Sequence, residues 1–144
     1  MLGAQSRRDG AIGFALLAAL TVGLGTAGAT PGRSQAPSRV TVVLTEWKLV
    51  PSATSVRAGK VTFRVRNDGT IVHEFVVLRT DRRPNALPVK GGVAIETAKL
   101  GRAANIAAGQ ERVLTLSLKP GKYVLICNLL GHYKAGQYAA LRVR

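Results

Sequence analysis

Apolar and polar side chains alternate from Val61 to Arg66, and this segment constrains the fold more than any other feature of the chain. Successive side chains of a strand point to opposite faces, so Val61, Phe63 and Val65 would line one buried face. Comparable segments recur between turns that contain Gly, Pro or Asn. Further strands are predicted at residues 40–49, 55–57, 74–79, 111–118, 123–127 and 138–143. Many short strands joined by such turns are typical of an all-β sandwich.

Residues 80–108 interrupt this pattern, because they contain several prolines and glycines and no clear alternation. We expect a long excursion there, with one helical turn around residues 95–100. The leucines of residues 111–118 share one face of a predicted strand, and we expect that face to point into the core. Four aromatic residues are also expected in the core: Trp47, Phe63, Phe75 and Tyr123.

The N-terminal region has the pattern of an export signal. Arg7 and Arg8 precede an apolar stretch over residues 11–25, and a small-residue cleavage pattern ends at Ala29. This order is typical of a secretory signal peptide, so we expect a periplasmic or extracellular protein. An uncleaved signal would instead anchor the chain in a membrane. The predicted organisation is a signal peptide at 1–29, a flexible linker rich in Pro, Gly and Ser at 30–38, and one folded domain at 39–144.

The composition is strongly basic, with 21 Lys and Arg residues, 7 Asp and Glu residues and a formal net charge of +14. Removal of the predicted signal peptide takes away Arg7, Arg8 and Asp9, which leaves +13. Such a charge favours acidic protein surfaces and anionic membrane surfaces as partners. Nucleic acid is not an expected partner, because the basic residues are scattered, with no run longer than Arg82-Arg83 and no interleaved aromatic residues.

The chain has one cysteine and two histidines, and all three fall at the ends of predicted strands or in adjacent loops. A lone Cys127 in an exported protein is buried and inert, reactive, or a metal ligand. Each residue taken alone has an ordinary structural explanation, but His73, Cys127 and His132 together supply two imidazoles and one thiolate. This donor set suits a trigonal copper site. Zinc binds similar donors, so the residue types leave the metal open.

Two segments carry a resemblance to a known family. Residues 127–137 (CNLLGHYKAGQ) resemble the C-terminal copper loop of the cupredoxins, the group of plastocyanin and azurin. Residues 67–74 (NDGTIVHE) resemble the upstream segment that carries the first histidine of that family. The resemblance implies a Greek-key β-sandwich with one type 1 copper ion, bound by His73, Cys127 and His132. It also implies that the backbone around His73 supports the thiolate, with Asn67 or Glu74 contributing.

Gln137 departs from the family pattern, because it stands where cupredoxins usually have an axial methionine. Met1 is the only methionine and belongs to the predicted signal peptide. The resemblance implies that Gln137 supplies a side-chain carbonyl oxygen to copper, as in the stellacyanin-like branch. An oxygen donor is harder than a thioether and favours Cu(II), so a lower reduction potential is expected.

The resemblance implies a non-enzymatic function, the transfer of single electrons between redox partners. Copper enzymes need further histidines or a second cysteine for their other centres, and this chain lacks them. Leu129 and Leu130 would form part of an apolar patch where a redox partner with an acidic docking surface binds. The alternatives are a copper carrier without a redox role and a metal-free fold that only binds partners.

Overall fold

The computed structural model describes residues 38–144, which form strands and turns and contain no helix. The predicted signal peptide and most of the predicted linker lie outside the described residues. No helix within 38–144 is therefore long and apolar enough to cross a membrane. The strands are β1 (Ser38–Thr45), β2 (Lys48–Pro51), β3 (Ser55–Val56), β4 (Gly59–Asn67), β5 (His73–Arg79), β6 (Val89–Lys90), β7 (Val93–Ala94), β8 (Lys99–Ile106), β9 (Glu111–Leu118), β10 (Gly121–Ile126) and β11 (Tyr138–Val143).

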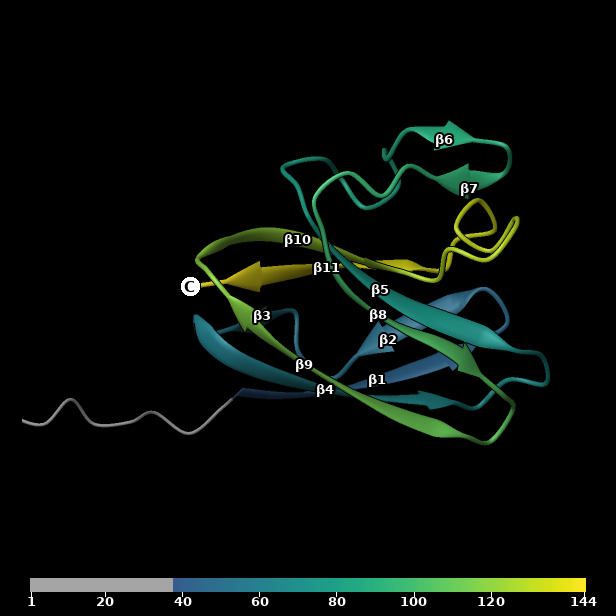
Figure 1. The fold of residues 1–144 in the computed structure, drawn as a ribbon, viewed down its shortest axis with the longest axis horizontal. Coiled ribbons are helices and arrows are strands. Elements are labelled where there is room, and N and C mark those ends of the chain that lie inside the picture. The colour runs from purple at the N-terminus through teal and green to yellow at the C-terminus, as the bar shows by residue number, and fades with distance from the viewer. Residues whose placement is uncertain (1–37) are drawn as a thin grey trace, which may run out of the picture. The chain divides into compact units, whose positions relative to one another are not determined.

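Two sheets make up the sandwich, which confirms the all-β prediction (Figure 1). One sheet has four strands in the order β2-β1-β4-β9, and the other has five in the order β3-β11-β10-β5-β8. β1 pairs in parallel with β4, and β11 pairs in parallel with β3, while the other pairs within these sheets are antiparallel. The order of the strands in both sheets differs from their order in the sequence, as a Greek-key sandwich requires.

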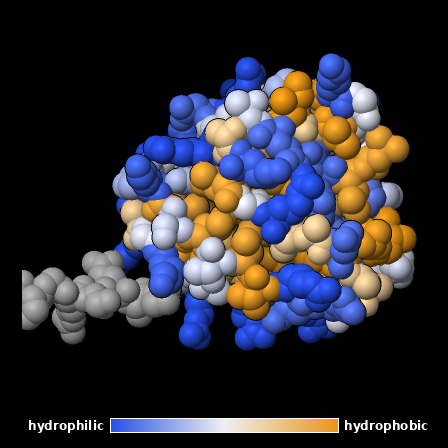
Figure 2. Space-filling view, in the orientation of Figure 1, coloured by the Kyte–Doolittle hydropathy of each residue, from blue (hydrophilic) through white to orange (hydrophobic). Residues whose placement is uncertain are grey.

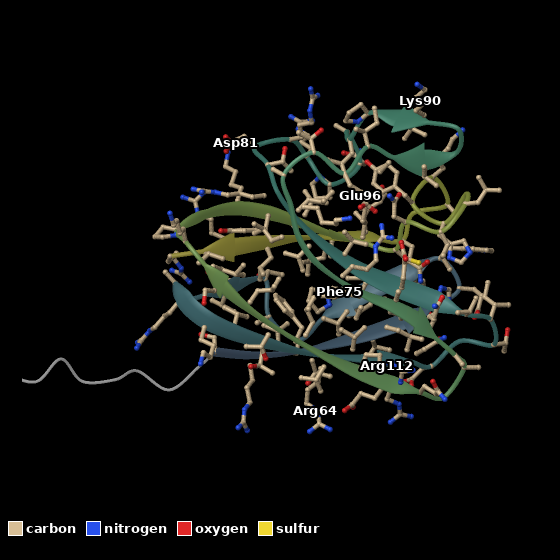
Figure 3. The ribbon with its side chains drawn as sticks, in the orientation of Figure 1. Arg64, Phe75, Asp81, Lys90, Glu96 and Arg112 are labelled. Atoms are coloured by element: carbon tan, nitrogen blue, oxygen red, sulfur yellow. The ribbon has the colours of Figure 1, made fainter. Side chains whose placement is uncertain are left out.

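The main core lies between the two sheets. The alternation in β4 has the predicted result, since Val61, Phe63 and Val65 are fully buried and the exposed side chains between them include Arg64. The ring of Phe63 packs against that of Phe75 from the facing sheet, with ring centroids 5.2 Å apart. Figure 3 labels Phe75 between the two sheets. Each such buried aromatic side chain contributes about 1.5–3 kcal/mol relative to an exposed one.

A second, smaller core covers the outer face of the five-stranded sheet. Val76 and Leu78 of β5 point to this face, while Phe75 and Val77 point to the main core. Strand β5 is therefore buried on both faces, apart from its last residue. The covering side chains come from the excursion after β5 and from the loop after β10, namely Leu87, Ala94 and Tyr133.

The predicted strand at residues 40–49 is in fact two strands. β1 and β2 form an antiparallel hairpin in which Thr45 pairs with Lys48. Trp47 occupies the turn with a φ of 67° and is 45% exposed, so the prediction that it lies in the core is wrong. A glycine or asparagine usually marks such a turn, and neither is present to signal it.

The excursion at residues 80–108 also differs from the prediction. No helical turn forms at residues 95–100, and β8 pairs with β5 at the edge of the five-stranded sheet. The inward positions of β8 include the small residues Gly101 and Ala103, which hide the alternation that large apolar residues would show. A Cβ atom at Gly101 would lie 2.8 Å from Cδ2 of Leu116, so any larger residue here would require the Leu116 side chain to move.

Strand β9 follows its predicted orientation. Leu118 is buried, Leu114 and Leu116 are half-buried against the main core, and Val113 on the other face is 61% exposed. Phe63, Phe75 and Tyr123 are likewise buried as expected.

Candidate metal centre

His73, Cys127 and His132 come together at one end of the sandwich. His73 is the first residue of β5, and Cys127 follows the last residue of β10. β5 and β10 are antiparallel neighbours, with Ile126 paired with Val76, so the start of one strand lies beside the end of the other. His132 reaches the same place from the loop after β10. One ligand atom from each of the three residues lies within 4.8 Å of the others.

The donor atoms that face one another are both imidazole Nδ1 atoms and the cysteine sulfur. The two Nδ1 atoms are 3.2 Å apart, and Sγ of Cys127 lies 3.4 Å from Nδ1 of His132 and 3.9 Å from Nδ1 of His73. Protein ligands bind a first-row metal ion at about 2.0 Å through nitrogen and about 2.3 Å through sulfur. A single ion at those bond lengths fits among atoms with these separations. His73 and Cys127 are fully buried and His132 is 8% exposed.

The loop from residue 127 to 137 is held by its own backbone hydrogen bonds. The His132 amide donates to the Leu129 carbonyl at 3.0 Å, and the Gln137 amide donates to the His132 carbonyl at 3.2 Å. The Cys127 amide donates to the Gln137 carbonyl at 3.0 Å, which closes the loop. The two ends of the loop are thereby tied, and Gln137 is brought beside Cys127 and His132.

Gln137 is fully buried, and its amide lies against both histidines. Its Nε2 donates to the Thr45 carbonyl at 2.9 Å. A carbonyl oxygen can only accept, so this contact places the amide nitrogen there and the amide oxygen on the opposite side. Oε1 lies 3.1 Å from Nδ1 of His132, and Nε2 lies 3.2 Å from Nδ1 of His73. The predicted fourth donor is therefore at the cluster, with its oxygen turned toward His132.

The sulfur of Cys127 accepts a hydrogen bond from the backbone amide of Glu74 at 3.3 Å. Burial raises the pKa of the Cys127 thiol, and this hydrogen bond opposes the rise. A bound cation would supply the positive charge that a buried thiolate needs. Asn67 has a different role from Glu74, since its side chain donates to the carbonyls of Ile71 and Ile106 and holds the turn that leads into β5.

Glu46 is a component of the site that sequence reasoning missed. Its Oε1 lies 3.5 Å from Nε2 of His73, a buried nitrogen that makes no hydrogen bond to the described residues. Hydrogen bonds from the amides of Thr70 and Ile71 hold the carboxylate and lower the pKa of Glu46 to about 2. The carboxylate is therefore ionised beside a histidine of the cluster. Its position in a turn 27 residues before His73 gave no signal in the sequence.

The imidazole of His73 is suited to bind a metal as a neutral ligand. Burial and the neighbouring His132 lower the pKa of His73, and the charge of Glu46 opposes this. A neutral imidazole carries one N–H group and one free nitrogen lone pair. With Nε2 facing Glu46, the lone pair of Nδ1 is directed toward the cluster.

A second layer of hydrogen bonds supports the residue that follows Cys127. The side chain of Asn128 accepts from the Ala94 amide at 2.7 Å and donates to the Ala94 carbonyl at 2.9 Å and to Glu96 at 3.0 Å. These contacts fix the start of the ligand loop to the excursion at β7. Tyr133 adds another link, because its hydroxyl donates to the Pro84 carbonyl and accepts from the Leu87 amide.

Two side chains with large exposed surfaces belong to the turn and the loop around His132. The ring of Trp47 meets the imidazole of His132 edge-on, with ring centroids 5.0 Å apart. Leu130, two residues before His132, is 75% exposed, while Leu129 is half-buried. In the space-filling view apolar residues reach the surface on the right-hand side, toward the metal centre, and also across the middle of the domain (Figure 2).

Several solved structures resemble the described fold. Auracyanin from Roseiflexus castenholzii has a TM-score of 0.58 and 19% identity, with 76% of this chain and 99% of that chain covered. Auracyanin A from Chloroflexus aurantiacus, described as a "blue" copper protein, has a TM-score of 0.53 and 19% identity, with 74% and 100% covered. Rusticyanin from Thiobacillus ferrooxidans has a TM-score of 0.55 and 14% identity, with 76% and 79% covered. No curated protein matches the sequence.

A family comparison agrees with the geometry of the site. The cupredoxin-like domain family matches residues 13–138, which is most of the chain. The buried group of two histidines and one cysteine fits a cupredoxin site and suits a single type 1 copper ion. The chain belongs to the cupredoxin-like family.

Proposed function

We propose that this protein is a single-electron carrier that binds one type 1 copper ion through His73, Cys127 and His132, with Gln137 as the fourth donor. The observation that carries the proposal is the convergence of two Nδ1 atoms and one Sγ atom in a buried cluster. Membership of the cupredoxin-like family supports it, as does the description of the similar auracyanin A as a "blue" copper protein.

When bound, copper would accept or release one electron by changing between Cu(II) and Cu(I). The residues of the chain limit the movement that accompanies this change. His73 and Cys127 are fixed by paired strands, and Gln137 is fixed by its hydrogen bond to Thr45. The Glu74 amide stabilises negative charge on the Cys127 sulfur. A ligand set held in this way reorganises little, which favours fast electron transfer.

The surface around His132 supports the proposal of a redox partner with an acidic docking surface. His132 is the most exposed of the cluster residues, and Leu130, two residues before it in the same loop, is 75% exposed. Lys134 follows in the same loop, and Lys48 follows Trp47; both lysines are exposed. An apolar contact with a basic rim suits a partner whose corresponding rim is acidic.

The main alternative is a copper carrier that delivers the ion to an acceptor. Burial of the cluster argues for retention, because Gln137, His73 and Cys127 are fully enclosed by the fold. The two functions differ in what happens to copper during use. We expect the copper-loaded protein to keep its metal through repeated reduction by ascorbate and oxidation by ferricyanide in the presence of a moderate chelator. Release of most of the copper during the first reduction would favour the carrier.

We also propose that the protein is exported and that residues 1–29 are removed. The charged start, the apolar stretch and the small residues before Thr30 support this. The mass of the protein recovered from a periplasmic fraction should correspond to a chain that begins at Thr30. A full-length mass in a membrane fraction would instead favour the uncleaved anchor.

A further inference from the structure

Nine exposed cationic side chains gather at the end of the sandwich opposite the metal centre, and we call this surface the basic pole. They are Arg57, Lys60, Arg79, Arg82, Arg83, Lys119, Lys122, Arg142 and Arg144. The register of the strands places them together, because β4 begins where β9 ends and β10 begins where β11 ends. Arg79 also donates to the Pro120 carbonyl, and the Ala58 amide donates to the Arg144 carbonyl.

Most acidic side chains of the described residues lie away from the basic pole. Glu46, Asp68, Glu74, Glu96 and Glu111 all lie in the half of the domain that holds the metal centre. Four of them are paired with cations there: Glu111 with Arg64, Asp68 with Arg66, Glu96 with Lys99 and Glu74 with Arg102. Among residues 38–144 the basic pole has a single acidic side chain, that of Asp81, which is labelled in Figure 3. It lies 3.8 Å from Lys122. Most of the positive charge that no carboxylate neutralises is therefore concentrated at the pole.

The basic pole contains a hollow of about 330 Å³. Its lining includes the four cationic residues Arg82, Arg83, Lys122 and Arg142, one carboxylate, Asp81, and apolar residues such as Leu141. The cations outnumber the carboxylate, so the hollow is positively charged. Guanidinium groups match the geometry of phosphate oxygens. The hollow is large enough to admit a phosphate group together with part of the glycerol that carries it.

The described chain also begins at the basic pole. Ser38, the first residue of β1, pairs with Val61 near the start of β4. The residues that precede Ser38 in the sequence therefore join the domain at this end. Trp47, beside the metal centre, lies beyond the far end of β1, whose eight residues span about 25 Å.

We propose that the basic pole docks on an anionic phospholipid surface, with a headgroup phosphate in the hollow lined by Arg82, Arg83, Lys122 and Arg142. A concentrated positive surface is attracted to anionic lipid headgroups, and each Lys or Arg near the surface adds to the affinity. Docking in this orientation turns the metal centre toward the aqueous phase, where a redox partner can reach it. The proposal goes beyond electron transfer and requires no bound metal, so it can fail or succeed independently of the copper site.

The first test compares two variants of the mature chain, which begins at Thr30 after the proposed removal of residues 1–29. The two variants have the same net charge. The pole variant combines Arg82→Gln, Arg83→Gln, Lys122→Gln and Arg142→Gln. The control variant combines Lys48→Gln, Lys90→Gln, Arg112→Gln and Lys134→Gln, all exposed residues in the metal half. Affinity for vesicles of phosphatidylcholine with phosphatidylglycerol is measured by sedimentation, and unchanged thermal unfolding checks that each variant folds.

We expect the pole variant to lose about tenfold or more in affinity and the control variant to lose about twofold or less. Residues 30–37 are common to all the proteins, so they cannot produce this difference. Equal losses of affinity in the two variants would overturn the proposal. It would also be overturned if the wild type bound vesicles of pure phosphatidylcholine as tightly as it binds vesicles that contain phosphatidylglycerol. Displacement from the vesicles by inorganic phosphate at matched ionic strength would also overturn it, because it would identify a site for a free anion.

The second test measures the orientation of the bound domain. Trp47 is the only tryptophan of the chain and lies beside the metal centre. Docking through the basic pole should leave its fluorescence unquenched by vesicles that contain brominated lipids. Strong quenching would show that the metal end faces the membrane and would contradict the proposal.

Discussion

Oε1 of Glu46 lies 3.5 Å from Nε2 of His73, on the ring edge that faces away from the cluster. A metal-binding histidine commonly directs its second nitrogen to a carboxylate, which fixes the tautomer and the orientation of the ring. The carboxylate is itself held by the amides of Thr70 and Ile71. The turn between β4 and β5 therefore holds the Glu46 carboxylate in place, and this carboxylate orients the ring of His73.

We expect Glu46→Gln to raise the reduction potential by tens of millivolts. The carboxylate charge stabilises the more positive Cu(II) state, and glutamine removes this charge while it can still accept the hydrogen bonds from Thr70 and Ile71. Protein-film voltammetry measures the change. Glu111→Gln is the matched control, because Glu111 is ion-paired with Arg64 on the outer surface. A shift of the same size in both variants would show that the contact between Glu46 and His73 does not set the reduction potential.

We expect Gln137→Met to raise the reduction potential as well. A thioether is softer than an amide oxygen and favours Cu(I), so its presence shifts the couple toward the reduced state. Voltammetry of this variant should be compared with that of Gln110→Met, which changes an exposed glutamine in the turn before β9. An unchanged or lower potential in Gln137→Met would rule out Gln137 as the axial donor.

Leu130→Lys should slow electron exchange with the partner protein and leave the copper spectrum unchanged. The side chain is 75% exposed in the loop that carries His132, so docking would desolvate a charge there, while the ligand atoms would keep their contacts. Stopped-flow mixing with the partner measures the rate. Val113→Lys adds the same charge to the outer face of β9, where 61% of the side chain is exposed. Equal slowing in both variants would point to net charge instead of a docking patch.

Glu96→Gln should lower the free energy of unfolding of the metal-free chain by about 1 kcal/mol near neutral pH. Burial opposes ionisation of Glu96, but hydrogen bonds from Lys99 and Asn128 and the charge of Arg102 outweigh it and lower the pKa of Glu96 below 4.5. A carboxyl group with a lowered pKa stabilises the fold above its unfolded pKa, and this contribution is lost as the pH falls through the folded pKa.

The difference between the wild type and Glu96→Gln should therefore shrink as the pH falls below 4.5. Urea unfolding at a series of pH values measures it. A difference that stayed constant, or grew, in acid would show that the ionised carboxylate does not stabilise the link between Glu96 and Asn128.

The residues that could be predicted from the sequence are those whose role depends on local pattern. Val61, Phe63 and Val65 are buried because alternation along a strand determines which face they occupy. His73, Cys127 and His132 lie at strand ends or in the adjacent loop, in segments that resemble those of cupredoxins. Their convergence was therefore predicted from that resemblance. Leu118 and its neighbours in β9 followed from the same period of two.

The features that could not be predicted depend on tertiary contacts. Trp47 leaves the core because the chain turns there with a positive φ, and no turn residue marks the position. β8 forms with Gly101 facing Leu116, so the close approach of the two sheets selects a residue that propensity disfavours in a strand. Glu46 reaches His73 only because the turn after β1 packs against the turn before β5.

Titration of the protein with Cu(II), followed by visible absorption and electron paramagnetic resonance, tests the copper site most directly, with Cys127→Ser as the control. The account predicts an intense thiolate-to-copper band that saturates at one equivalent in the wild type and is absent in the variant. No such band in the wild type, or an equal band in Cys127→Ser, would contradict the claim that His73, Cys127 and His132 form a type 1 copper site.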